Sequence, residues 1–163
     1  MRKTITKAFI GFFVLTSIVV IIFSIISHRN SEAYKYKILD ISYDIYSDRF
    51  YPYDFCFKVA EALNNSKNSD EINAKRDSIL KSWYKIEVMK SEKVEIDKSI
   101  KSLKHPPKKF KEAYNVLQQE YEEYNQIYYN VFNPSGSYKT FTNECYKHYK
   151  NIEKYHKTIS QLL

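Results

Sequence analysis

Residues 110–162 read FKEAYNVLQQEYEEYNQIYYNVFNPSGSYKTFTNECYKHYKNIEKYHKTISQL. In the first half, apolar and aromatic side chains recur at alternating steps of four and three, at Phe110, Tyr114, Leu117, Tyr121, Tyr124, Tyr128 and Val131. The second half has the same spacing at Tyr138, Phe141, Cys145, His148, Ile152, Tyr155, Ile159 and Leu162. Each half therefore predicts a helix with one apolar stripe, the pattern of helices that pack lengthwise. The short turn at 133–136, which contains Pro134 and Gly136, makes the pair antiparallel.

Four helices are predicted after the N-terminal segment. The first covers 32–65 and is kinked at Pro52, because proline lacks the N–H of a helical hydrogen bond and crowds the preceding turn. The second covers 69–104, and the antiparallel pair covers 107–132 and 137–162. Alternating strands are hard to find, and the chain has only two glycines.

The predicted helix ends have recognisable caps. Asn68 with Glu71 three residues later resembles a capping box. The dipeptide Pro106-Pro107 ends one helix, because the residue before a proline avoids helical angles, and Pro107 suits the first turn of the next. Ser135 or Ser137 is expected to cap the last helix.

The N-terminal segment predicts a membrane anchor. A basic flank, 1–7, precedes an uncharged run of 20 residues, 8–27. At about 1.5 Å per residue this run is as long as a bilayer core is thick. The positive charge before it places the N-terminus in the cytoplasm and 28–163 outside, as a single-pass protein of the cell membrane. The alternative is a cleaved signal peptide, which has a shorter apolar region and a small-x-small site that Ser24-Ile-Ile-Ser27 does not supply.

The expected fold class is therefore all-α: an N-terminal transmembrane helix followed by an antiparallel three- to four-helix bundle with coiled-coil-like seams. In this topology the turn at 105–107 and the C-terminus lie near the membrane. The polar turns at 64–68 and 133–136 lie at the opposite end, where we expect a partner to bind.

Six lysines without an intervening acid surround the turn at 105–107, namely Lys98, Lys101, Lys104, Lys108, Lys109 and Lys111. If this turn faces the membrane, each lysine close to the surface contributes up to about 1 kcal/mol of attraction to anionic headgroups. The alternative is an ordinary solvated turn.

The charge distribution argues against a nucleic-acid partner. The net charge is +7, but residues 1–30 hold four basic side chains and no acidic one. The remaining 133 residues carry 22 basic and 19 acidic side chains, a balance of only +3. That balance is typical of an ordinary solvated surface.

Two cysteines, Cys56 and Cys145, are predicted at similar depths in the first and last helices, which are neighbours in a four-helix arrangement. A disulfide between them is allowed outside the cytoplasm. The alternative is a pair of buried thiols, because free cysteine packs as a small apolar residue.

Neither a metal site nor a cofactor is predicted. Cys145-x-x-His148 lacks the four closely spaced ligands of a structural zinc site. Glu153-x-x-His156 is half of a di-iron bundle motif, which needs a second copy and two further glutamates that point inward. The sequence indicates no histidine partner for Glu120 or Glu123.

No catalytic residues are predicted either. The chain has no Gly-rich phosphate loop and no recognisable nucleophile motif. The function we expect is a membrane-anchored, extracytoplasmic interaction or accessory protein that binds membrane lipid through its anchor and another protein through its surface. The alternative is a tethered binding protein with a small-ligand pocket between tyrosine-rich helices. The oligomeric state is left open, because heptad seams close within one chain or between chains.

Overall fold

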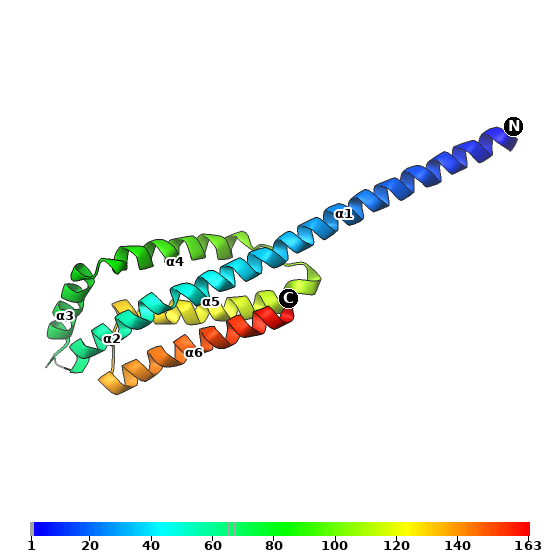
Figure 1. The fold of residues 1–163 in the computed structure, drawn as a ribbon. Coiled ribbons are helices and arrows are strands. Elements are labelled where there is room, and N and C mark those ends of the chain that lie inside the picture. Colours follow the sequence, from blue (N-terminus) through cyan, green and yellow to red (C-terminus); the bar gives the residue numbers. More distant parts are fainter. Residues whose placement is uncertain (1, 65, 67) are drawn as a thin grey trace. The chain divides into compact units, whose positions relative to one another are not determined.

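The computed structural model describes the backbone of residues 2–64, 66 and 68–163 (Figure 1). Every element in these ranges is a helix, which confirms the all-α class. The elements are α1 (Arg2–Asp48), α2 (Phe50–Asn64), α3 (Ser69–Ser82), α4 (Lys85–Ser102), the 3₁₀ turn η1 (Lys108–Phe110), α5 (Lys111–Phe132) and α6 (Tyr138–Leu162). The chain divides into two compact units, Met1–Tyr36 and Lys37–Leu163.

The first unit consists of the N-terminal part of α1. Among the residues that the structure describes, no helix is long and apolar enough to cross a membrane. The predicted anchor, 8–27, falls mainly on 8–19 and 21, whose side chains lie outside the described residues. The structure thus gives the anchor no support beyond a helical backbone, and the anchor stays a prediction.

The second unit is a helical bundle whose centre is apolar. Helix α5 packs along α6, and α2 packs against both. The fully buried side chains include Ile45 of α1, Phe55 of α2, Leu117 of α5 and Phe141 of α6. Burying side chains of this size stabilises a fold by about 1.5–3 kcal/mol each.

The break between α1 and α2 falls at Arg49, three residues before Pro52. A proline removes one helical hydrogen bond and crowds the carbonyl four residues earlier, here that of Asp48, the last residue of α1. The backbone stays helical around the break, since the amide of Arg49 bonds the carbonyl of Ile45 at 3.1 Å. The structure therefore interrupts the predicted helix 32–65 at Arg49, about one turn upstream of the proline.

The sequence predicts one helix over 69–104, whereas the structure divides it into α3 and α4 at Trp83 and Tyr84. Neither glycine nor proline lies at this break. The indole ring of Trp83 packs on Phe55 of α2 with ring centroids 4.8 Å apart. We therefore attribute the break to a tertiary contact. The chain turns at Trp83 so that the indole ring can pack on Phe55.

Two predicted N-caps are present, whereas Pro107, predicted in the first turn of a helix over 107–132, precedes η1 and α5 begins at Lys111. The side chain of Asn68 accepts a hydrogen bond from the amide of Glu71 at 2.9 Å and begins α3. Of the two candidate serines, Ser137 caps α6 by accepting from the amide of Thr140 at 3.2 Å. Each such cap is worth about 0.5–2 kcal/mol.

The two ends of the second unit carry different connections (Figure 1). The proximal end, where the unit begins at Lys37, also carries the α4–α5 connection and the C-terminal residue Leu163. The distal end carries the α2–α3 and α5–α6 connections. The antiparallel order predicted for the helices therefore holds within this unit.

Candidate functional site

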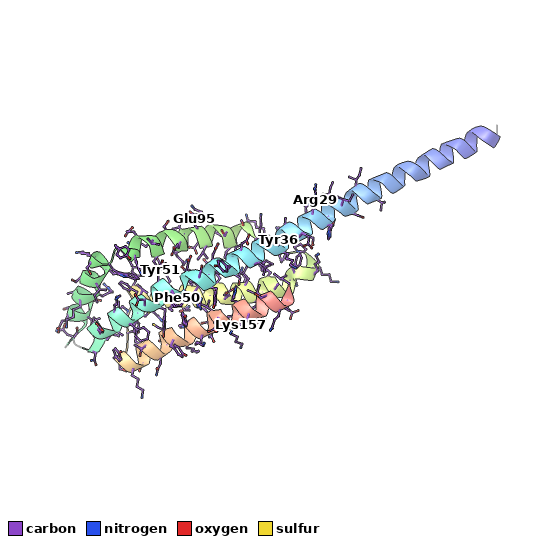
Figure 2. The ribbon with its side chains drawn as sticks, viewed as in Figure 1. Arg29, Tyr36, Phe50, Tyr51, Glu95 and Lys157 are labelled. Carbon is purple, nitrogen blue, oxygen red and sulfur yellow. The ribbon has the colours of Figure 1, made fainter. Side chains whose placement is uncertain are left out.

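A row of aromatic side chains covers the junction between α2 and α6. The rings of Tyr53 and Tyr149 are stacked, with centroids 4.3 Å apart. Three further rings join this pair: Phe50 contacts Tyr149 at 5.6 Å, and Phe57 and Tyr146 contact Tyr53 at 5.0 and 6.3 Å. We call these five residues the aromatic face. Figure 2 shows Phe50 at the start of α2 and Lys157 on α6.

The aromatic face is open to solvent. Phe50, Phe57 and Tyr146 keep 56%, 38% and 51% of their surface exposed. Single exposed apolar residues are ordinary, but contiguous ones mark interaction sites in soluble folds. Aromatic residues are also the side chains most enriched in protein–protein interfaces.

A buried arginine lies at the proximal edge of the aromatic face. Arg49 is only 3% exposed, and its guanidinium carbon lies 3.5 Å from the ring centre of Tyr46 and 4.6 Å from that of Tyr149. It also donates to the carbonyl of Tyr46 and to the hydroxyl of Tyr149. Its charge is thus held by ring faces and hydrogen bonds, a desolvated cation–π arrangement.

Next to Arg49 lies a buried polar cluster of Ser42, Glu120 and His156, contributed by α1, α5 and α6. Glu120 is fully buried, and its carboxyl accepts a hydrogen bond from the hydroxyl of Ser42 at 2.6 Å. The same hydroxyl oxygen lies 2.9 Å from Nδ1 of His156. Since the hydroxyl has one proton and gives it to Glu120, its oxygen accepts from Nδ1–H of His156.

The buried cluster is neutral near pH 7. Burial raises the pKa of Glu120 from 4.5 to about 8, against the hydrogen bond from Ser42 and the charge of Arg49. Burial and then the charge of Arg49 lower the pKa of His156 from 6.5. The two groups therefore hold one proton each in the folded chain at pH 7, the carboxyl as an acid and the imidazole as a neutral ring.

The cluster resembles a Ser–His–Glu set in composition only. Ser42 is fully buried and donates to the carboxyl rather than to the imidazole, so it is not an exposed, activated nucleophile. The imidazole nitrogen Nδ1 lies 4.0 Å from the carboxyl of Glu120, beyond hydrogen-bond distance. We assign the cluster a structural role in joining three helices.

Two glutamate–histidine pairs join α5 to α6, although the sequence indicated no histidine partner for either glutamate. Glu120 lies beside His156, and Glu123 accepts from His148 at 2.5 Å and from the side-chain amide of Asn151 at 2.9 Å. In the described part of the chain, no three histidine, cysteine, aspartate or glutamate side chains gather as a metal would require. Neither Cys145-x-x-His148 nor Glu153-x-x-His156 forms a ligand set, because each histidine faces a glutamate of α5.

The structure brings Cys56 and Cys145 together but does not bond them. Both are fully buried free cysteines. The Cys56 thiol also points to the carbonyl of Ile127 at 3.9 Å, and Cys145 accepts from the side chain of Asn130 at the same distance. The predicted proximity is confirmed, and the predicted disulfide is corrected to a thiol pair. Burial raises the pKa of Cys56, and this disfavours the thiolate from which a disulfide forms.

The six predicted lysines form a basic rim at the proximal end of the second unit. All six are exposed: Lys98, Lys101, Lys104, Lys108, Lys109 and Lys111. Lys98 pairs with Glu95 at 2.7 Å, and the ammonium group of Lys109 lies 4.6 Å from the ring of Phe110. The rim surrounds the connection between α4 and α5, where His105 has a positive φ of 55°.

Two open hollows lie away from these features. One, of about 360 Å³, is lined between α2 and α3 by Lys58, Glu61, Ala62, Lys75, Ser78 and Ile79. The other, of about 320 Å³, is lined at the α3–α4 break by Leu80, Lys81, Trp83, Tyr84, Ile86, Glu87, Lys90 and Phe132. Neither is lined by the tyrosine rows of α5 and α6 in which a ligand pocket was expected.

Comparison with known proteins gives the chain no relative. No protein-family model matches it, and no curated protein and no solved structure is significantly similar to it.

Proposed function

We propose that this chain is a membrane-anchored interaction protein that binds a protein partner through the aromatic face. Residues 8–27 are the anchor, and 37–163 form the extracytoplasmic bundle. The observation that carries the proposal is the aromatic face itself: five contiguous rings on α2 and α6, three of them at least one-third exposed. Such a surface is costly to leave in water and gains free energy when a partner covers it.

The proposal of an anchor rests on the sequence, in which 8–27 is an uncharged run of 20 residues. The large apolar side chains described there are more than half exposed, namely Val20, Ile22, Phe23, Ile25 and Ile26. Lipid would cover these side chains. The basic rim then adds electrostatic attraction to anionic headgroups, and this attraction falls as salt rises.

The anchor and its orientation are tested with reporters fused to the full chain. Alkaline phosphatase at the C-terminus should be active, and the mass of the mature protein should include 1–27. An inactive C-terminal reporter refutes the orientation. A mature protein that begins after the apolar run shows that this run is a cleaved signal peptide.

The binding surface is tested with a photoreactive amino acid placed at Tyr146 in cells. The matched control is Tyr129 of α5, which is 58% exposed and lies outside the aromatic face. We expect a discrete crosslinked protein at 146 and none at 129. Equal products at both positions, or none at either, contradict an interaction surface at the aromatic face.

The hollow at the α3–α4 break supports a second candidate function, the binding of a small ligand. Its lining includes Trp83 and Phe132 together with Lys81, Lys90 and Glu87, and Lys90 pairs with Glu87 at 2.8 Å. A medium-chain fatty carboxylate would place its chain against the rings and its carboxylate near Lys81. Titration with decanoate should change the fluorescence of Trp83, the only tryptophan, and an unchanged spectrum contradicts the candidate.

A further inference from the structure

The aromatic face has a border of net negative charge on the side of α2 and a border of net positive charge on the side of α6. On the side of α2, the exposed residues Asp54, Lys58 and Glu61 follow one another at helical spacing, so two acids flank one base. On the side of α6, Lys150 and Lys157 are exposed and lie in one row, because both bond Glu153. The aromatic rings thus separate borders of opposite charge.

The ring contacts also define which residues of the two helices lie at the same height. Helices α2 and α6 are antiparallel: Phe50 contacts Tyr149, and Tyr53 contacts Tyr146. With the stacked pair of Tyr53 and Tyr149, these contacts place position i of α2 level with positions 199 − i to 202 − i of α6. Glu61 therefore lies level with 138–141, a range that includes Lys139. By the same register, Asp54 lies level with positions 145–148, two to five residues before Lys150.

The arrangement is complementary to itself under one particular twofold axis. This axis lies in the interface and runs parallel to the helices. It places α2 of one copy opposite α6 of the other, and every residue keeps its position along the helix direction. Glu61 then faces Lys139 of the second copy, Asp54 faces the turn that holds Lys150, and Phe57 meets the Tyr146 region. A twofold axis across the helices would instead place each border opposite its own copy, so that borders of the same net charge face each other.

We infer that the partner of the aromatic face is a second copy of this chain, bound as a parallel dimer about an axis that runs along the helices. This inference rests on the proposed function and specifies the partner of the same surface. The contact is isologous, so each charge pair occurs twice. The aromatic rings supply the buried centre and the charged borders supply orientation, as in other protein interfaces.

The same axis suits two anchored chains. Rotation about it leaves the proximal ends of both copies, each beginning at Lys37, on one side of the dimer. Both chains then continue toward their first units in one direction. The axis across the helices would send the two chains in opposite directions, which a shared membrane forbids.

The test is a charge swap between Glu61 and Lys139 in the full chain, solubilised in a mild detergent. Sedimentation velocity gives the mass of the protein and the dimer dissociation constant. Glu61→Lys and Lys139→Glu each turn two attractions into repulsions, so each should weaken dimerisation by about 5–20-fold. The double variant restores opposite charges across the axis and should return to within about threefold of the original chain.

Two controls keep the test specific. Tyr129→Ala, at an exposed tyrosine of α5, should leave dimerisation unchanged, and Trp83 fluorescence should show that every variant is folded. An association driven by the anchor alone would be insensitive to the swap. An insensitive dimer, or a double variant no better than the singles, therefore overturns the inference.

The photocrosslink at Tyr146 separates this inference from the proposed function. A chain–chain product that maps to α2 of the second copy supports the dimer. Capture of a different protein with no chain–chain product, together with a monomer in sedimentation, overturns the dimer and leaves the interaction function standing. If no crosslinked product forms at Tyr146, both the dimer and the interaction function are contradicted.

Discussion

The carboxyl of Glu120 is fully buried beside Ser42 and His156, so the stability of the bundle should depend on pH through this group. Burial raises its pKa from 4.5 to about 8. Between these two pH values the unfolded chain has lost this proton while the folded chain keeps it. Each unit of rising pH in that range should therefore lower the free energy of unfolding by about 1.4 kcal/mol through this group.

Replacement by the neutral isostere removes this dependence. At pH 5 the carboxyl is largely protonated in the folded chain and partly protonated in the unfolded one, so Glu120→Gln should change stability by less than about 1 kcal/mol. At pH 7 the variant should be more stable than the original chain by about 2–3 kcal/mol, since it loses no proton on unfolding. His156 acts in the opposite direction below pH 6.5, because its pKa is lowered and the unfolded chain takes up the proton more readily.

The assay is urea unfolding of the full chain in detergent from pH 5 to pH 8, followed by the fluorescence of Trp83. At each pH, the free energy of unfolding of the variant is compared with that of the original chain. His156 is present in both chains, so its contribution cancels in the difference. Glu122→Gln is the matched control, since Glu122 is exposed on the same helix. A difference for Glu120→Gln that stays constant from pH 5 to pH 8 would refute a neutral, buried carboxyl.

Three further predictions concern the core, a cap and the thiols. Phe141→Ala should lower the free energy of unfolding by about 3–5 kcal/mol, and Tyr129→Ala by less than about 0.5 kcal/mol, because only the first empties a fully buried site. Asn68→Ala should cost about 0.5–2 kcal/mol in urea unfolding through loss of the α3 cap, and an unchanged midpoint would speak against that cap. Without reductant, the unfolded chain should titrate two thiols, Cys56 and Cys145, and the folded chain should react slowly at both; a count of zero after unfolding would mean a disulfide.

The apolar stripes of α5 and α6 follow from the sequence only in part. In α6, Phe141, Cys145, Ile152 and Ile159 are buried as predicted, whereas Tyr138 and Leu162 are exposed. The buried positions of α5 include Ala113, Glu120 and Ile127. The predicted stripe instead placed Tyr121 and Tyr128 at the centre, and both are half-buried at its edge. Tyrosine hydroxyls need partners, and that of Tyr121 finds one at the edge by donating to Asp97 at 2.6 Å.

The polar cluster could not be predicted, because it depends on residues that binary patterning assigns to the surface. A glutamate is almost never fully buried without a partner. The partners of Glu120 are Ser42 and His156, 78 residues before it and 36 residues after it, on two other helices. Only the relative rotation of three helices brings them together. The signal available was Glu120 itself, which lies three residues after Leu117 and four before Tyr124 at core spacing.

The proximity of the two cysteines could be predicted from the sequence, whereas the break between α3 and α4 could not. The proximity of Cys56 and Cys145 follows from helix length and antiparallel order, which the turns determine. The α3–α4 break at Trp83 follows from packing on Phe55, and no local glycine or proline indicates it. Turn chemistry is local and can be read from sequence, whereas a break caused by one ring reaching the core cannot.

Hydroxyl-radical footprinting tests the central claim, that a partner covers the aromatic face. The oxidation of Tyr146 is compared between intact cells expressing the full chain and the same chain purified at high dilution, with Tyr129 as the internal reference. We predict that Tyr146 is protected in cells and becomes reactive on dilution, while Tyr129 reacts equally in both. Equal oxidation of Tyr146 in the two states would contradict a covered aromatic face.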